Sequence, residues 1–180
     1  MPMSTEGGST EGGCLACELI EGTAPLPGGT ILRTANWVVE HCVGPLGLGT
    51  VVVKPIRHVV HVAELAADET HELGPLLQRV SDAVTQVTEP EQVYVCLWSH
   101  AGGAPGHIHF VVQPARKDDL AQHNAYGPEL QMAMFNVGRV PDQGQVVDVC
   151  DRLRTALAGE GSTAAGSGCP QLPQPGPLSM

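Results

Sequence analysis

The chain has 180 residues, of which 42% are hydrophobic but only 3% aromatic, and its formal net charge is -10 with a pI near 5.1. This length suits one domain with tails, and the shortage of aromatics requires a core of Val, Leu and Ala. Because binding to a nucleic-acid backbone needs a positive surface, the acidic balance excludes general nucleic-acid binding. A small anionic substrate remains compatible, since a local pocket can be positive on an acidic protein.

The cysteine pattern predicts a reducing, cytoplasmic setting. Of six cysteines, only Cys14 and Cys17 are closely spaced. In a reducing compartment, a Cys-x-x-Cys motif indicates metal or redox chemistry rather than a structural disulfide. The N-terminus lacks a positive region followed by an apolar run, so no signal peptide is expected. No stretch approaches the ~18 apolar residues of a membrane span, so no membrane partner is expected either.

Composition divides the chain into one folded domain and two tails. Residues 1–12 are mostly Gly, Ser, Thr and Glu, and residues 159–180 are rich in Gly, Ser, Ala and Pro. Neither composition can form a core, so both segments are predicted to be disordered. The folded domain is then expected over residues 13–158.

The first half of this domain reads as short strands followed by one long helix. Strands are expected over Thr30–Arg33, Trp37–Glu40 and Thr50–Val53, the last an apolar, β-branched run typical of a central strand. A helix is predicted over Ala67–Thr88, where leucines and valines recur at helical spacing. Because Pro75 fits poorly inside a helix, regular geometry is expected to begin only there.

The second half reads as two more strands and two short helices. The strands are expected over Val93–Trp98 and Ile108–Gln113, joined by a loop rich in Gly and Pro. The helices are expected over Leu130–Phe135 and Val146–Leu157. This order predicts an α+β domain with a mainly antiparallel sheet.

Two histidines at the start of a predicted strand indicate a functional site. In His107-Ile-His109 the alternation places both imidazoles on one face, and the preceding loop adds His100. Imidazole suits nucleophilic, proton-transfer or metal-ligand roles near neutral pH. The alternative is that they are two polar residues on the solvent face of a strand.

Four motifs in the right order resemble the histidine triad (HIT) family of nucleotide hydrolases and transferases. These are Cys14-Leu-Ala-Cys17, the segment Gly49-Thr-Val-Val-Val-Lys-Pro-Ile-Arg-His58, Val62-Ala-Glu-Leu65 before the long helix, and His107-Ile-His109-Phe-Val-Val-Gln-Pro, which keeps two of the three signature histidines. The likeness covers roughly residues 14–115. It implies a HIT-like α+β fold with an antiparallel sheet of about five strands, one long helix and short flanking helices. It further implies a zinc-containing member with an incomplete triad.

The resemblance assigns a structural zinc to Cys14, Cys17, His58 and His107. Two Cys and two His make a tetrahedral set with no open position, which contributes stability rather than chemistry. An unmetallated or redox-active cysteine pair is the alternative.

The same resemblance makes His109 the nucleophile. In the family the middle histidine attacks the α-phosphorus of a nucleotide and forms a nucleotidyl-histidine intermediate. The expected substrate is a nucleotide phosphoanhydride or phosphoramidate, such as a dinucleoside polyphosphate, and the enzyme is a hydrolase or nucleotidyl transferase. The attacking nitrogen must be free, so the other should donate to a backbone carbonyl. The backbone N–H groups of Gly102 and Gly103 are expected to hold the phosphate.

Several positions depart from the family pattern. Val111 replaces the third signature histidine, and Gln113 is the candidate to substitute as a donor, on the face of His109. Ser99 is expected to donate to phosphate, and His100 is a candidate acid for the leaving group. These departures keep open an alternative function, a zinc-stabilised nucleotide-binding module with little or no catalysis.

Two further expectations concern charge and assembly. Basic residues flank the two histidine-bearing strands and lend local positive charge to an anionic substrate, with solvated surface as the default interpretation: Lys54, Arg57, Arg116 and Lys117. Family members often pair through the helix and neighbouring strands, so the resemblance implies a homodimer.

Overall fold

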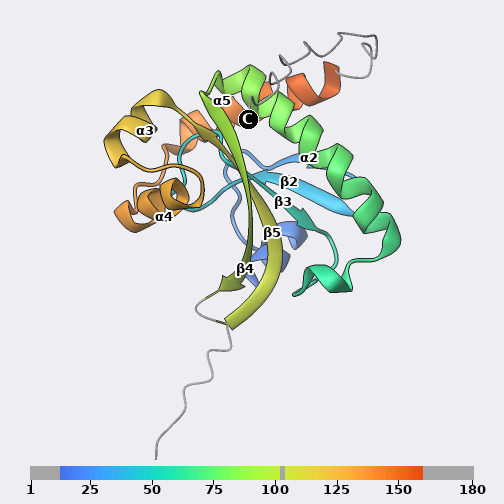
Figure 1. The fold of residues 1–180 in the computed structure, drawn as a ribbon. Coiled ribbons are helices and arrows are strands. Elements are labelled where there is room, and N and C mark those ends of the chain that lie inside the picture. The colour runs from blue at the N-terminus through green and yellow to red at the C-terminus, as the bar shows by residue number, and fades with distance from the viewer. Residues whose placement is uncertain (1–12, 102–103, 160–180) are drawn as a thin grey trace, which may run out of the picture.

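A computed structural model describes residues 13–101 and 104–159 (Figure 1). The predicted N-terminal tail lies outside these residues, as does the predicted C-terminal tail except for Gly159, which is the last residue of a helix. The strands are β1 (Thr30–Arg33), β2 (Trp37–His41), β3 (Val51–Pro55), β4 (Gln92–Ala101) and β5 (Ala104–Ala115). They form one antiparallel sheet in the order β1-β2-β3-β5-β4, which confirms the predicted α+β class.

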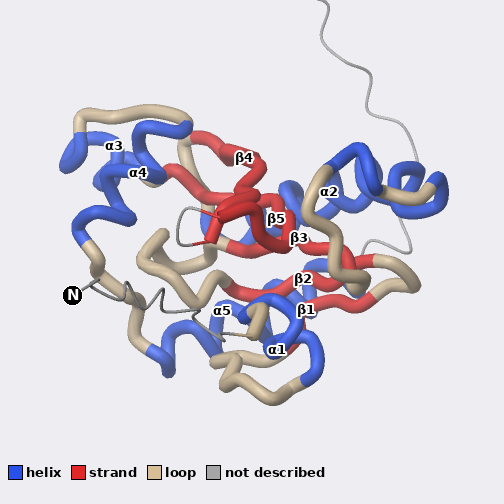
Figure 2. Tube along the Cα trace, turned by 90° about the horizontal axis from the view of Figure 1, so that it is seen from below, coloured by secondary structure: helices blue, strands red, loops and turns tan. Residues whose placement is uncertain are grey.

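Five α-helices and one 3-10 turn accompany the sheet in the described residues. They are α1 (Leu15–Glu21), the 3-10 turn η1 (Val62–Glu64), α2 (Ala67–Thr88), α3 (Lys117–His123), α4 (Pro128–Val137) and α5 (Gln143–Gly159). In both views α3 and α4 lie side by side on the flank opposite α2 (Figure 2). The short α1 and α3 were not predicted, and α5 exceeds its expected range at both ends. None of the helices in these described ranges combines the length and the apolar character needed to cross a membrane.

One face of the sheet forms the main core with α2 and α5. The sheet contributes Trp37, Val39, Val53 and other residues that point away from the cavity described below. The two helices contribute apolar stripes at helical spacing, which are listed here: Leu76, Val80, Ala83, Val84 and Val87 from α2, and Val146, Val149, Cys150, Leu153 and Leu157 from α5. Burying these side chains stabilises the fold, each by roughly 1.5–3 kcal/mol for a large apolar residue.

The long helix α2 begins at Ala67, so the prediction that Pro75 delays its start is wrong. The carboxylate of Glu69 accepts a hydrogen bond from the backbone N–H of Ala66 at 2.7 Å, so this donor at the start of the helix has a partner. Pro75 lies on the exposed side, while its neighbour Leu76 is buried. Packing of the apolar stripe therefore outweighs the hydrogen bond that proline removes.

The segment predicted as a Gly/Pro loop between the last two strands is largely strand. β4 and β5 form a long hairpin in which Trp98 pairs with His109, and after a register shift His100 pairs with Pro105. The irregularity lies between these two pairs, where the single residue Ser99 of β4 faces residues 106–108 of β5, as in a β-bulge. The hairpin brings His100 to the same end of the sheet as the two signature histidines.

Candidate functional site

A cavity of about 280 Å³ lies on the face of the sheet opposite α2 and α5. It is lined by side chains from α1, β2, β3, β4, β5 and α4, among them Leu19, Glu40, Lys54, Trp98, His109 and Phe135. The alternation of β5 places His107 and His109 toward this cavity and turns the buried Ile108 away from it. The size is near the lower end of small-molecule sites.

Four side chains at one end of the cavity converge as a metal-ligand set. The ligand atoms of Cys14, Cys17, His58 and His107 all lie within 4.8 Å of one another. The Cys17 Sγ atom is 3.3 Å from Nδ1 of His58 and 3.6 Å from Nδ1 of His107, and Cys14 Sγ is 3.8 Å from the latter. Tetrahedral zinc with ordinary Zn–S and Zn–N bonds separates its ligands by about 3.3–3.8 Å. The donor set therefore fits zinc.

Three separate chain segments supply these ligands. Cys14 precedes α1 and Cys17 lies in its first turn, so both thiols emerge on one side of the helix. The N–H of Ile108 donates to the Val59 carbonyl at 2.9 Å, which places the segment after β3 against β5. The rings of His58 and His107 then meet edge to face with centroids 5.0 Å apart.

His107 is held in the tautomer that a metal ligand needs. Its Nε2–H donates to the Pro55 carbonyl at 2.9 Å, so the lone pair of Nδ1 faces the cysteines. Burial lowers the pKa of His107 to about 4, with smaller contributions from His58 and Lys54, so the ring is neutral at physiological pH. Burial also raises the pKa of the Cys17 thiol to about 11, and the interaction with Cys14 acts in the same direction.

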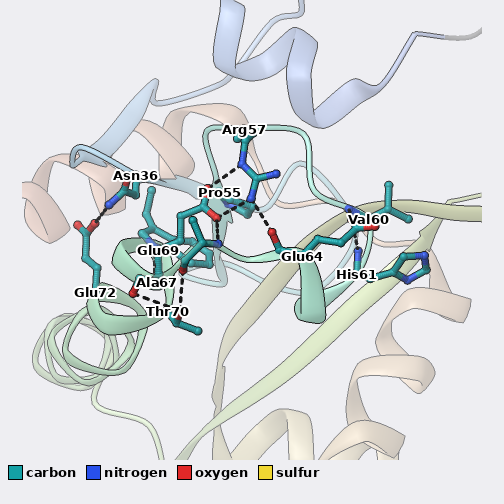
Figure 3. Close-up of polar contacts among 12 residues, drawn as sticks. Asn36, Pro55, Arg57, Val60, His61, Glu64, Ala67, Glu69, Thr70 and Glu72 are labelled. Atoms are coloured by element: carbon teal, nitrogen blue, oxygen red, sulfur yellow. Dashed lines mark hydrogen bonds and ion pairs between the residues drawn. The ribbon is translucent and has the colours of Figure 1, made fainter.

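Arg57 and Glu69 anchor the segment that carries His58 (Figure 3). The guanidinium of Arg57 donates to both carboxylate oxygens of Glu69, at 3.2 and 2.7 Å, and to the Glu64 carbonyl at 2.7 Å. This partner lowers the pKa of Glu69, and the Ala66 N–H acts in the same direction. On the other side of His58, the Glu64 carboxylate accepts the backbone N–H of His61 at 3.3 Å. His58 is thus flanked by contacts to the start of α2 on one side and to η1 on the other.

His109 bonds to the backbone through Nδ1, whereas His107 does so through Nε2. Its Nδ1–H donates to the His107 carbonyl at 3.0 Å, which leaves the Nε2 lone pair toward the cavity. Burial lowers its pKa, and the charge of Lys54 adds to this effect. In this tautomer Nε2 is the nitrogen that remains available, and no partner for it is found among the described residues.

Aromatic side chains form a wall of the cavity beside His109, which sequence reasoning missed. Trp98 pairs with His109 across the hairpin, and its ring lies 5.6 Å from that of Phe135 on α4. The indole N–H donates to Oε1 of Gln131 at 2.8 Å and so fixes the ring. A tryptophan directly opposite the second signature histidine was the available signal, since paired residues of a hairpin share one face.

Of the other predicted site residues that the structure describes, only His100 lines the cavity. His100 lines the cavity and is exposed, whereas Ser99 is half-buried and does not line it. Gln113 is fully buried, and its amide donates to the Leu46 carbonyl at 3.0 Å, so it is not brought together with His109. Gly102 and Gly103 lie outside the described residues.

Lys54 is not part of the solvated surface, contrary to the default interpretation. Its ammonium is 2.6 Å from the carboxylate of Glu40, and both side chains are only 2% exposed. Both residues line the cavity, because position 40 of β2 and position 54 of β3 project from the same face as His109. A buried ion pair thus lies within the cavity.

His41 fixes the loop that closes one side of the cavity. Its Nδ1–H donates to the Cys42 carbonyl at 2.8 Å, and its Nε2 accepts the N–H of Gly49 at 3.0 Å. Both nitrogens are committed, and burial lowers the pKa of the ring, so this imidazole is neutral. The ring thus joins Cys42 at the start of the loop to Gly49 near its end. Gly49 adopts a φ of 85°, a conformation that favours glycine.

Sequence comparison finds no matching family model and no matching curated protein. Solved structures do match. A zinc-bound histidine triad family protein from Mycobacterium smegmatis is 21% identical over 83% of this chain and 96% of its own, with a TM-score of 0.61. The fold is that of the histidine triad family.

Two other histidine triad structures support this assignment. A hypothetical histidine triad nucleotide-binding protein from Sulfolobus tokodaii is 16% identical, covering 81% of this chain and 92% of its own, with a TM-score of 0.61. A Hit-like protein involved in cell-cycle regulation from Bartonella henselae is 12% identical, covering 79% and 95%, with a TM-score of 0.62. The resemblance expected from the motifs is therefore confirmed for the histidine triad fold.

Proposed function

We propose that this chain binds a nucleotide in the cavity and cleaves its phosphoanhydride or phosphoramidate bond through His109, as a hydrolase or nucleotidyl transferase. The observation that carries the proposal is the Nδ1–H···O=C bond from His109 to His107, which frees Nε2 within the cavity. A nucleophilic imidazole needs this tautomer.

The reaction has two displacements. The Nε2 lone pair of His109 attacks the α-phosphorus, a P–N bond forms, and the bond from phosphorus to the leaving group breaks. His100, which lines the cavity and reaches solvent, is the candidate to give the leaving group its proton. Water or another acceptor then attacks the nucleotidyl-histidine, so that the imidazole leaves and the nucleotide is released.

The walls of the cavity suit the uncharged part of a nucleotide. Leu15 and Leu19 of α1 line it together with Trp98 and Phe135, and such apolar surfaces bury a planar base. The structure named as a nucleotide-binding protein among the similar folds is consistent with this ligand class. A dinucleoside polyphosphate is the substrate type that we favour.

We further propose that Cys14, Cys17, His58 and His107 hold a structural zinc ion. Support comes from the closeness of their ligand atoms, all within 4.8 Å of one another, and from the zinc-bound protein of the same fold. Zinc would stabilise the two thiolates and close the N-terminal arm onto β3 and β5. With four protein ligands it has no open position, so no chemical step is assigned to it.

A nucleotide-binding module with little catalysis is the second candidate function. Val111 is buried in the cavity where the family has its third histidine, and Gln113, the candidate substitute, donates to Leu46 instead. The side chains around His109 therefore supply fewer donors to a phosphate than a complete triad would.

The deciding experiment is a search for the covalent intermediate. The protein is incubated with labelled dinucleoside polyphosphate and with an adenosine phosphoramidate, quenched, and tested for an acid-labile nucleotidyl adduct. We expect an adduct in the wild type and in His71→Ala, an exposed control on α2, but none in His109→Ala. An adduct that survives His109→Ala overturns the assigned nucleophile. Nucleotide binding without adduct or turnover establishes the binding module instead.

A further inference from the structure

The buried Glu40–Lys54 pair is the most unusual feature of the cavity. The two groups lie on adjacent central strands, since Glu40 pairs with Val52 and Lys54 with Val38. Their charged atoms are 2.6 Å apart, and almost no solvent reaches them. Most of the surrounding lining is apolar, including Leu15, Leu19 and Val52.

Stability alone does not account for this pair. Removing two charges from water has a high desolvation cost, and replacement of a buried pair by apolar residues of similar size is often neutral or stabilising. Moreover, Oε1 of Glu40 has no hydrogen-bond partner among the residues that the structure describes. The Oε1 of Gln113 and Nε2 of Gln131 share this property, but neither residue lines the cavity. Glu40 therefore presents an unused acceptor in a ligand-sized space.

We propose that Glu40 and Lys54 determine base specificity by binding the polar edge of the nucleobase. Oε1 of Glu40 accepts a hydrogen bond from an N–H group of the base, and the ammonium of Lys54 donates to a neighbouring ring nitrogen or carbonyl oxygen. The pair thus offers one acceptor beside one donor, which complements the adjacent donor and acceptor of a nucleobase edge. This inference rests on the proposed nucleotide-binding function.

The strand order places Glu40 at the right reach from His109. β3 lies between β2 and β5, so Glu40 and His109 are two strand spacings apart, about 10 Å across the sheet. Lys54 lies on the intervening strand β3, closer to His109, and its ammonium extends from there to the Glu40 carboxylate. A sugar hydroxyl is only a few bonds from the α-phosphorus, whereas the base edge lies much farther along the nucleotide. With phosphorus at His109, the base edge rather than the sugar reaches Glu40.

The test compares nucleotides that differ only at the base edge. Adenosine monophosphate has an amino donor there, whereas purine riboside monophosphate has none, so its binding would leave the Glu40 acceptor unpaired. We expect the wild type to bind adenosine monophosphate, or another natural monophosphate with such a donor, at least about tenfold more tightly than the matching ligand without the donor. This ratio, measured by calorimetry, corresponds to ~1.4 kcal/mol of binding free energy. Equal affinities for the donor-bearing and donorless ligands would overturn the proposal without any variant.

Variants separate recognition from folding. The double substitution Glu40→Leu with Lys54→Met removes the pair at similar volume, and it should keep its thermal stability while the preference falls to about twofold or less. Asp151→Asn is the control, because Asp151 forms an ion pair of the same 2.6 Å length with Arg154 outside the cavity; it should retain the full preference. A double variant that folds and keeps the wild-type preference contradicts the proposal.

Three other outcomes are informative. If deoxyribonucleotides, rather than donorless bases, reproduce the loss seen in the double variant, Glu40 binds the sugar and the base-edge assignment is wrong. If the wild type binds no nucleotide, the proposed function fails and this inference with it. If nucleotides bind and modify His109 regardless of their base edge, only the inference fails.

Discussion

His109 donates its Nδ1–H to the backbone carbonyl of His107 at 3.0 Å, while His107 donates its Nε2–H to the Pro55 carbonyl at 2.9 Å. The two rings on one strand thus expose opposite nitrogens. Nδ1 of His107 faces the cysteines, and Nε2 of His109 faces the cavity. Two histidines on the same strand face thus direct their remaining nitrogens to different surroundings.

The first prediction concerns these tautomers. In nitrogen-15 correlation spectra we expect His109 as the Nδ1–H form and His107 as the Nε2–H form, because each hydrogen bond fixes one proton. Removal and return of zinc should shift Nδ1 of His107 strongly and leave the tautomer of His109 unchanged. A His109 resonance with the proton on Nε2 would be incompatible with its role as nucleophile.

The second prediction concerns metal content. Cys17→Ser should lower the zinc content well below one ion per chain and reduce the melting temperature, because loss of one ligand weakens a site whose binding energy contributes to folding. Cys96→Ser is the matched control, since Cys96 is half-buried on β4 and lies outside the cluster. Elemental analysis and thermal melting measure both effects. Unchanged zinc in Cys17→Ser would exclude this thiol as a ligand.

The third prediction concerns the pH dependence of stability. The pKa of Glu69 is lowered in the folded state by Arg57, so its contribution is fully present above the unfolded value of about 4.3 and is lost as the pH falls through the folded pKa. Glu69→Gln should lower the free energy of unfolding near neutral pH by about 1 kcal/mol, the usual effect of losing a helix N-terminal cap.

Denaturant titrations at several pH values check this expectation. The difference between Glu69→Gln and the wild type should shrink on acidification below pH ~4, as the wild-type carboxylate becomes protonated. Asp68→Asn, an exposed carboxylate in the same first turn, should show a much smaller difference at every pH. A pH-independent deficit in Glu69→Gln would contradict the role of the Arg57 ion pair.

The fourth prediction concerns His41. His41→Ala leaves the N–H of Gly49 and the carbonyl of Cys42 without their partner, so we expect a loss of about 1–3 kcal/mol of stability. His41→Asn should recover less than the full loss, because its shorter amide cannot reach both groups. His61→Ala, at an exposed position, is the control for loss of an imidazole. Equal stability of the two alanine variants would refute this structural role.

The fifth prediction tests a homodimer, which we propose from the family resemblance. β4 is an edge strand, and its Val95 and Leu97 side chains are each 43% exposed. Such an apolar edge favours pairing with a second copy. We expect light scattering to give twice the chain mass, and Leu97→Glu to give a monomer. Val147→Glu, an exposed valine on α5, should leave the mass unchanged, and a monomeric wild type would disprove the dimer.

The sequence by itself determined the main elements, and it singled out four residues whose ligand atoms the fold brings within 4.8 Å of one another. The helical spacing of apolar residues gave α2 its bounds, and alternation placed His107 and His109 on one face. Both signals are local, because they follow from the periods of helix and strand. The motif order likewise indicated the histidine triad fold that the solved structures share.

Only the tertiary structure decided which polar groups meet. Lys54 resembles a surface lysine in the sequence, and its burial against Glu40 depends on the pairing of β2 with β3. Gln113 shares the strand face of His109 by period, yet the Leu46 carbonyl of a distant loop takes its amide. In both cases the two partners are far apart along the chain. A local sequence pattern therefore does not show which contact lowers the free energy of the fold most.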